Sequence, residues 1–170
     1  GWFAGKLPDL NPDDPQMGLY LAQNALWWAE TAHLDGFRID TFPYSSRQFW
    51  SGWSERLRAV YPHLNSVGEV ADSDPSITAF FEGGRKQFDG IDTGLATVFD
   101  FPLCAVLRDV VIKGQPMERL VTVLEHDSLY PHPEMLVTFL GNHDNRRFVS
   151  EEGSSAAKLK AAMGLLLTLR

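Results

Sequence analysis

Hydrophobic positions at helical spacing predict two long helices in the first part of the chain. The first extends from about residue 15 to residue 33, because Asp14 can cap it and Pro15 suits its first turn. The second covers residues 49 to 60 and follows a capping-box pattern at Ser45, with a Gln three residues later. Residues 1–16 contain Pro8, Pro12 and Pro15, so we expect a loop there.

Short apolar runs separate the helical segments and predict strands. The four predicted strands cover residues 34–40, 66–70, 97–101 and 135–140. Further helices are expected at about 72–81, at about 102–125 with a break near 114–116, and from Ser154 or Ser155 to the end of the chain. Glycines between residues 83 and 94 predict an irregular excursion.

The order of these elements indicates the fold class. Helices and strands alternate along the chain, which implies a parallel sheet with right-handed crossovers. Four strands are half of an eight-stranded barrel, and 170 residues are too few for a whole one. We therefore expect an α/β fold: a partial (β/α)8 TIM barrel of about four parallel strands with flanking helices.

Composition and charge narrow the range of functions. The chain is 44% hydrophobic and has a formal net charge of −7. That charge argues against nucleic acid or an anionic membrane as a partner, and it suits an enzyme that acts on a neutral substrate. No apolar run is long enough to span a bilayer. Cys104 is the only cysteine, so an intrachain disulfide is excluded, and its apolar neighbours favour a buried structural side chain over a nucleophile.

Three short segments, each at the end of an apolar run, carry acids. The segments are Gly36-Phe37-Arg38-Ile39-Asp40, Gly68-Glu69-Val70 and Gly141-Asn142-His143-Asp144. Because the ends of parallel barrel strands meet at one rim, we expect the three acids to be buried together in one cleft. Buried carboxylates are costly without a function. Cleavage of a glycosidic bond is such a function, since it needs one carboxylate as nucleophile and one carboxyl as proton donor.

Each acid also has a plainer interpretation when it is taken alone. Arg38 and Asp40 share one face of a strand, where the Arg keeps a nucleophilic carboxylate ionised or forms a structural salt bridge. Glu69 is either a proton donor in a partly desolvated site or an exposed side chain at a strand end. His143 and Asp144 can bind a metal, hold sugar hydroxyls or stabilise a turn. The combination is far more specific than its parts.

Together these segments resemble the alpha-amylase family, glycoside hydrolase family 13. Residues 35–40, Asp-Gly-Phe-Arg-Ile-Asp, look like the nucleophile strand of that family, and residues 68–70 look like its acid/base strand. Residues 139–144, Phe-Leu-Gly-Asn-His-Asp, look like its third motif. Residues 7–11, Leu-Pro-Asp-Leu-Asn, resemble a short motif near the end of its inserted domain B. All four occur in family order and span nearly the whole chain.

The resemblance implies a role for five residues. Asp40 would be the nucleophile and Glu69 the acid/base. Asp144 would bind hydroxyls of the distorted sugar and stabilise the transition state. Arg38 would hold Asp40, and His143 would donate a hydrogen bond to the sugar in the cleaved subsite.

The resemblance also implies two segments in the chain and allows an expectation about calcium binding. It implies that residues 1–16 end the inserted domain B loop and that residues 17–170 form a partial catalytic barrel, about strands four to seven. The family's first motif, an Asn-His on an earlier strand, is absent. Many members carry a His four residues after the nucleophile, where this chain has Tyr44, although Asp9 of the domain B motif is present. This departure argues against a structural calcium ion, and the implied chemistry requires no cofactor.

The implied activity is that of a retaining alpha-glucan hydrolase on starch-like or maltodextrin substrates, with a covalent glucosyl-enzyme intermediate. A transglycosylase of the same family would use the same residues and differ only in the acceptor. A non-catalytic carbohydrate-binding relative is a third interpretation, although such relatives usually lose at least one acid. The preference for α-1,4, α-1,6 or cyclic substrates stays open, and the sequence indicates no cellular location.

The isolated chain should also behave as a fragment. A half barrel has two open sheet edges, which we expect at residues 34–40 and 135–140. Exposed edges and large apolar faces invite association, so we expect the chain to pair with another copy. We also expect weak or no hydrolysis by the chain alone, because a preorganised site needs all of its walls.

Overall fold

The structure is a computed structural model that describes residues 2–3 and 5–169. The predictions made for residues 1–16 and for the last helix therefore lie outside the described residues at positions 1, 4 and 170. The chain forms two compact units. Unit 1 comprises Gly1–Glu69 and Gly83–Ala96, and unit 2 comprises Val70–Glu82 and Thr97–Arg170.

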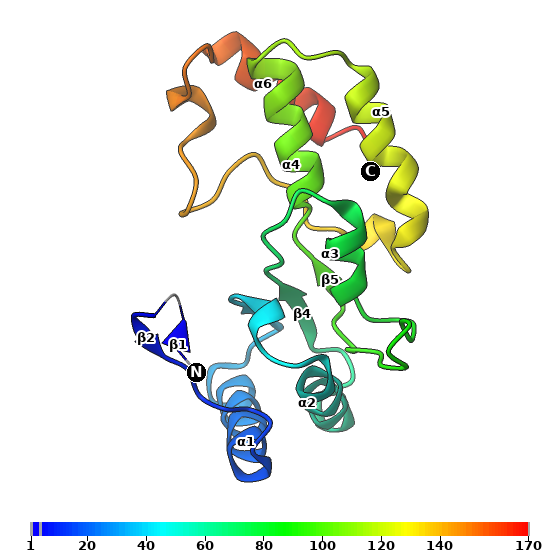
Figure 1. The fold of residues 1–170 in the computed structure, drawn as a ribbon. Coiled ribbons are helices and arrows are strands. Elements are labelled where there is room, and N and C mark those ends of the chain that lie inside the picture. The colour runs from blue at the N-terminus through cyan, green and yellow to red at the C-terminus, as the bar shows by residue number, and fades with distance from the viewer. Residues whose placement is uncertain (1, 4, 170) are drawn as a thin grey trace. The chain divides into compact units, whose positions relative to one another are not determined.

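Unit 1 combines two helices with two pairs of short strands (Figure 1). In chain order its elements are β1 (Trp2–Phe3), β2 (Leu7–Pro8), α1 (Pro15–Ala32), β3 (Gly36–Ile39), a 3₁₀ turn (Phe42–Tyr44), α2 (Arg47–Val60) and β4 (Asn65–Gly68). Strands β1 and β2 pair antiparallel. Strands β3 and β4 pair in parallel, with Gly36 opposite Asn65 and Ile39 opposite Gly68. The first two predicted strands are therefore confirmed as neighbours.

Side chains that accept backbone hydrogen bonds determine where the two helices begin. The Asp14 carboxylate accepts from the backbone N–H groups of Gln16 and Met17, at 3.0 Å each, as the sequence predicts. Helix α2 is capped by Ser46, whose Oγ accepts from Phe49 N at 3.1 Å. The predicted cap at Ser45 is wrong by one residue, because Ser45 instead ends the preceding 3₁₀ turn.

The core of unit 1 supports the turn that follows β3. Helices α1 and α2 contact one another (Figure 1). Trp50 and Trp53 of α2 are buried. The Trp50 ring stacks on the Phe42 ring with a centroid distance of 4.5 Å, and its Nε1–H donates to the Phe42 carbonyl at 2.8 Å. These two contacts fix Phe42 from both its side chain and its backbone.

Unit 2 is mainly helical. Its elements are α3 (Pro75–Phe81), β5 (Thr97–Val98), α4 (Phe101–Leu107), a π-helical turn (Arg108–Ile112), α5 (Glu118–Glu125), α6 (Ala156–Leu166) and three short 3₁₀ turns at His126–Leu129, Pro133–Met135 and Phe148–Ser150. The predicted break near residues 114–116 is confirmed, with Gly114 at φ +67°. The Ser155 side chain caps α6. Buried apolar residues from α4, α5, α6 and the loops form one core: Leu103, Leu107, Val110, Leu120, Leu140, Phe148 and Ala162.

The fourth predicted strand, residues 135–140, is wrong in this structure. Val137 forms only an isolated parallel bridge with Phe99. Val137 N donates to Val98 O at 3.1 Å, and Asp100 N donates to Val137 O at 3.0 Å. The ladder stops there because Asp100 already caps α4, and Pro102 lies in the first turn of that helix. The described residues thus hold β3, β4 and β5 where four parallel strands were expected.

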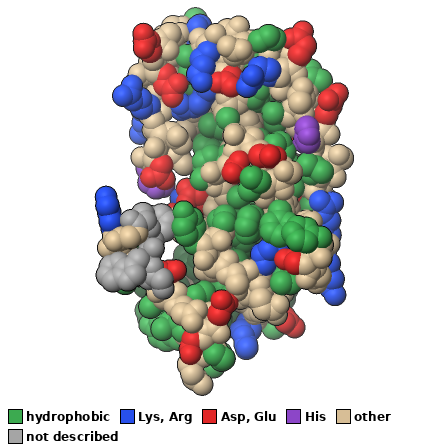
Figure 2. Space-filling view, in the orientation of Figure 1, with side chains coloured by type: hydrophobic (Ala, Val, Ile, Leu, Met, Phe, Trp, Pro, Cys, Tyr) green, Lys and Arg blue, Asp and Glu red, His purple; other side chains and the backbone are tan. Residues whose placement is uncertain are grey.

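The described surface mixes charged and apolar side chains. On the face that Figure 2 presents, acidic and basic side chains lie interspersed with hydrophobic ones. On α1, Tyr20, Trp27 and Trp28 are exposed. No helix within the described residues is both long enough and apolar enough to cross a membrane.

Candidate active site

The parallel pairing of β3 and β4 places two of the predicted acids side by side. Asp40 directly follows β3 and Glu69 directly follows β4, and the last residues of the two strands, Ile39 and Gly68, are opposite one another. Glu69 N donates to Ile39 O at 2.9 Å, and Phe42 N donates to Glu69 O at 3.1 Å. The backbone of Glu69 is therefore tied to the end of β3 from both sides.

One guanidinium group joins the two carboxylates. Arg38 Nη2 lies 2.8 Å from Glu69 Oε1, and Arg38 Nη1 hydrogen bonds to Asp40 Oδ1. The expected pairing of Arg38 with Asp40 is present, and the contact with Glu69 adds to it. Because both acids contact the same planar group, that group holds their two carboxylates near one another.

The two carboxylates differ sharply in exposure. The Glu69 side chain is 8% exposed, whereas the Asp40 side chain is 67% exposed. The Asp144 side chain is also exposed, at 61%. The expectation that all three acids are buried is therefore wrong for Asp40 and Asp144. Glu69 alone is enclosed, because the turn after β3 folds over it, whereas Asp40 points to solvent, where a ligand can reach it.

Thr41 supplies a second donor to Glu69. Its backbone N–H donates to Glu69 Oε2 at 3.1 Å, so the two oxygens of that carboxylate have different partners. Thr41 adopts the left-handed conformation, with φ 43° and ψ 43°. That conformation costs about 1–2 kcal/mol for an L-residue and is unusual for a β-branched side chain. Strained backbone of this kind concentrates at functional sites. Sequence analysis missed Thr41, since no local signal marks a Thr for this conformation.

His143 and Asp144 form a separate cluster in unit 2. His143 Nε2 lies 3.3 Å from Asp144 Oδ2. The Asn142 side-chain oxygen accepts from Asp144 N at 3.0 Å and from Asn145 Nδ2 at 2.8 Å. Asn142 thus organises a tight turn that presents both side chains. The predicted site residues therefore form two groups, Arg38 with both acids in unit 1, and His143 with Asp144 in unit 2.

Unit 2 also contains a cavity of about 310 Å³ next to this turn. Its walls come from the segments that follow β4 and β5 in the chain and from the loop after residue 140: Ala71, Asp72, Ser73, Phe101, Cys104, Ala105, Arg108 and Asn145. The volume falls within the range of small-molecule sites. Polar and apolar side chains are mixed in these walls.

The residues that the resemblance links to calcium, Asp9 and Tyr44, are both exposed. Calcium takes six to eight oxygen ligands, mostly carboxylates and carbonyls. Nowhere in residues 2–3 and 5–169 do three or more His, Cys, Asp or Glu side chains gather closely enough to hold a metal ion.

Cys104 has the environment that its sequence context predicts. The side chain is 5% exposed and lies on α4. Burial raises the pKa of the Cys104 thiol, and the nearby Arg108 only partly opposes that shift. A thiol that stays protonated is a weak nucleophile, so Cys104 does not compete with the acids for a catalytic role.

Comparison with known proteins defines the class to which this fold and site belong. A sequence model described as the alpha amylase catalytic domain matches residues 2–170. The chain belongs to the alpha-amylase family of glycosidases, the family that its motifs resemble.

Individual relatives agree with this assignment. The chain is 25% identical to a maltogenic alpha-amylase from Bacillus acidopullulyticus over 171 residues, which cover 98% of the chain and 27% of the relative. It is 27% identical to a cyclomaltodextrinase from Geobacillus thermopakistaniensis, covering 98% of the chain and 27% of that protein. Among solved structures, the alpha-amylase of Geobacillus thermoleovorans in complex with acarbose matches with a TM-score of 0.84 and 28% identity, covering 99% of the chain and 37% of that structure. The chain thus spans about a quarter of the length of these curated relatives, and its fold is that of a partial α/β segment of their catalytic domain.

Proposed function

We propose that the protein containing this chain is a retaining alpha-glucan hydrolase. Glu69 donates a proton to the leaving glycosidic oxygen while an Asp40 carboxylate oxygen attacks the anomeric carbon. The bond to the leaving sugar breaks and a covalent glucosyl ester on Asp40 forms. Glu69, now ionised, takes a proton from a water molecule, whose oxygen attacks the same carbon and releases Asp40.

The observation that carries this proposal is the single guanidinium shared by Asp40 and Glu69 at the ends of two adjacent parallel strands. A retaining mechanism needs two carboxyl groups about 5–5.5 Å apart, and a shared guanidinium holds two carboxylates at short range. The different exposures suit different roles, because the open Asp40 can reach a substrate carbon and the enclosed Glu69 is held in place by Arg38 and by Thr41 N–H.

The shared Arg38 is paired with both acids. Ester formation removes the charge of Asp40 and leaves Arg38 paired with Glu69 alone. One guanidinium group thus holds both reacting side chains in place.

Asp144 and His143 complete the proposal as sugar-binding groups. We propose that Asp144 accepts hydrogen bonds from hydroxyls of the distorted ring and that His143 donates to the sugar in the cleaved subsite. Their exposure and the Asn142 turn that presents them support this role. We also propose that residues 1–16 end an inserted loop domain, and that residues 17–170 belong to a larger (β/α)8 barrel.

The substrate class follows from the relatives. The matched proteins are named maltogenic alpha-amylase and cyclomaltodextrinase, and the matched alpha-amylase structure contains acarbose. We propose α-linked glucan oligosaccharides or polysaccharides as the substrate. Transfer to a sugar hydroxyl is the second candidate, because a cyclomaltodextrin glucanotransferase also matches, at 28% identity. Chain-lengthened products from a maltooligosaccharide would favour transfer, and shorter products alone would favour hydrolysis.

Variants of the full-length protein test the assignment of the two acids. Hydrolysis of maltooligosaccharides should fall by about 100- to 10,000-fold in Glu69→Gln, as expected for a lost general acid, and at least as far in Asp40→Asn. Asp35→Asn is the matched control, because Asp35 lies at the other end of the same strand. It should keep near-normal turnover. Near-normal hydrolysis by Asp40→Asn would show that the nucleophile is misassigned.

A further inference from the structure

We propose that Arg108 is a positioning residue that fixes the loop carrying His143 and Asp144. This inference rests on the proposed function for the roles of those two residues, but its structural part stands on contacts within unit 2. Arg108 lies in the π-helical turn after α4, more than thirty residues before the loop. Neither the motifs nor the helical pattern singles it out.

Arg108 binds both ends of the loop with one side chain. Its Nε and Nη2 donate to the Leu140 carbonyl at 3.1 and 2.8 Å, and Nη2 also donates to the Arg146 carbonyl at 2.8 Å. Leu140 immediately precedes the segment Gly141–Asn145, and Arg146 immediately follows it. A planar fork of fixed geometry therefore closes the base of the loop.

The guanidinium is itself held in place. Its Nη1 forms an ion pair with Glu151, and the group lies 5.9 Å from the centre of the Phe148 ring. The Arg108 side chain is only 12% exposed. Gly141 is tight against it, because a Cβ at that position would lie 3.2 Å from Nη2. Charge pairing, burial and a glycine contact all keep the fork at one position.

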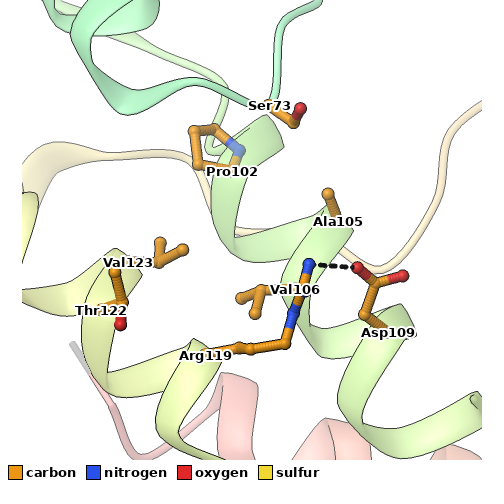
Figure 3. Close-up of a pocket in the computed structure, with 8 residues that line it drawn as sticks. All are labelled: Ser73, Pro102, Ala105, Val106, Asp109, Arg119, Thr122 and Val123. Carbon is orange, nitrogen blue, oxygen red and sulfur yellow. Dashed lines mark hydrogen bonds and ion pairs between the residues drawn. The ribbon is translucent and has the colours of Figure 1, made fainter. Parts of the chain in front are cut away.

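Arg108 is the first residue of a π-helical turn. Lys113 N donates to Arg108 O at 3.3 Å, a hydrogen bond to the fifth preceding residue that widens the helix by one position. The next residue, Asp109, faces elsewhere and pairs with Arg119 of α5 across a cavity of about 330 Å³ (Figure 3). Two adjacent charged residues thus have separate partners, and only Arg108 reaches the loop. π-bulges of this kind occur frequently at functional sites.

The loop needs such support because its own contacts are local. Asp144 N donates to the Asn142 side chain, and the Asp144 carboxylate is paired with the neighbouring His143. A displacement of about 1 Å in a group that binds the transition state can lower the rate about a hundredfold. Arg108 therefore contributes to catalysis through the position of Asp144.

Three variants of the full-length protein separate this role from a simple loss of charge. Arg108→Met removes the fork, and Arg108→Lys keeps the charge for Glu151 but lacks the planar fork that donates through both Nε and Nη2. Arg119→Met is the matched control, because it removes an Arg from the neighbouring ion pair with Asp109 and leaves the loop untouched (Figure 3). Hydrogen exchange of peptides covering residues 141–147 measures the loop, and steady-state hydrolysis of a maltooligosaccharide measures its effect.

We expect faster exchange at residues 141–147 in Arg108→Met and in Arg108→Lys, with control rates in Arg119→Met. We also expect kcat to fall about 10- to 100-fold in both Arg108 variants with little change in KM, because the lost contact acts in the transition state. Unchanged exchange in both would overturn the inference, and so would full activity in Arg108→Lys. If the wild-type protein has no glucan activity, the proposed function fails, and the exchange measurement still decides whether Arg108 holds the loop.

Discussion

Replacing Gly68 with Ala tests how β4 positions Glu69. A Cβ at residue 68 would lie 2.6 Å from Leu95 Cδ2 and 3.1 Å from Phe42 Cγ. Both distances are shorter than ordinary contacts, and neither neighbour can retreat, since Leu95 is 2% and Phe42 is 1% exposed. Overpacking of this kind costs about 1–3 kcal/mol. We expect Gly68→Ala to lower the free energy of unfolding by that amount.

The same change should also disturb the site. Phe42 begins the turn whose preceding residue, Thr41, donates to the Glu69 carboxylate. A shifted Phe42 therefore moves one of the two donors to Glu69, and turnover of a maltooligosaccharide should fall along with stability.

Gly52→Ala is the matched control for this prediction. Gly52 lies on α2 with open space around its Cβ position, and Ala favours a helix over Gly by about 0.5–1 kcal/mol. Urea denaturation followed by tryptophan fluorescence measures both variants. Stabilisation by Gly52→Ala with destabilisation by Gly68→Ala is expected. Equal stability of Gly68→Ala and wild type would refute the packing argument.

Three further predictions concern other parts of the chain. Asp74 caps α3, so Asp74→Ala should cost about 1 kcal/mol of stability in denaturant unfolding. Hydrogen bonds from the Ser76 side chain and backbone lower the pKa of Asp74. The stabilisation by Asp74 should therefore be complete above its unfolded-state pKa and lost as the pH falls through its lower folded-state pKa. If the free energy of unfolding of Asp74→Ala falls with acid as steeply as that of the wild type, this prediction is contradicted. Cys104 should resist alkylation at about pH 8 in the native protein and react after denaturation, because burial raises the pKa of its thiol. Mass spectrometry measures the labelling, and fast labelling of the native protein would contradict the burial of Cys104. The isolated 170-residue chain should self-associate, because Trp27 and Trp28 expose aromatic surface on α1, and Trp28→Ser should weaken the association. Light scattering measures both, and a clean monomer at high concentration would contradict this prediction.

Local signals explain why much of the fold is predictable from the sequence. Asp14 and Pro15 mark the start of α1 through contacts within three residues. The apolar runs that become β3 and β4 are flanked by helices and pair as expected. Residues 135–140 show the limit of this reasoning. An apolar run becomes a strand only where a partner continues beside it, and β5 gives way to α4 after one paired residue.

The site divides in the same way. Arg38, Asp40 and Glu69 were identified because their motifs occur in order at strand ends, and the structure groups them on one guanidinium. Thr41 was missed because its left-handed backbone opposes its intrinsic preference. Arg108 was missed because its partners lie 32 to 43 residues away, and a charged residue in a helical pattern normally indicates a solvated face.

The most direct test of the account is to trap the glucosyl-enzyme. A glucosyl fluoride needs little acid assistance to leave, so the Glu69→Gln variant of the full-length protein should still form the ester but lack the base that hydrolyses it. Rapid denaturation, proteolysis and mass spectrometry should then find one added glucosyl group on the peptide that contains Asp40. A glucosyl group on another carboxylate, or release of the inverted sugar without any adduct, would contradict the assignment of Asp40 as the nucleophile.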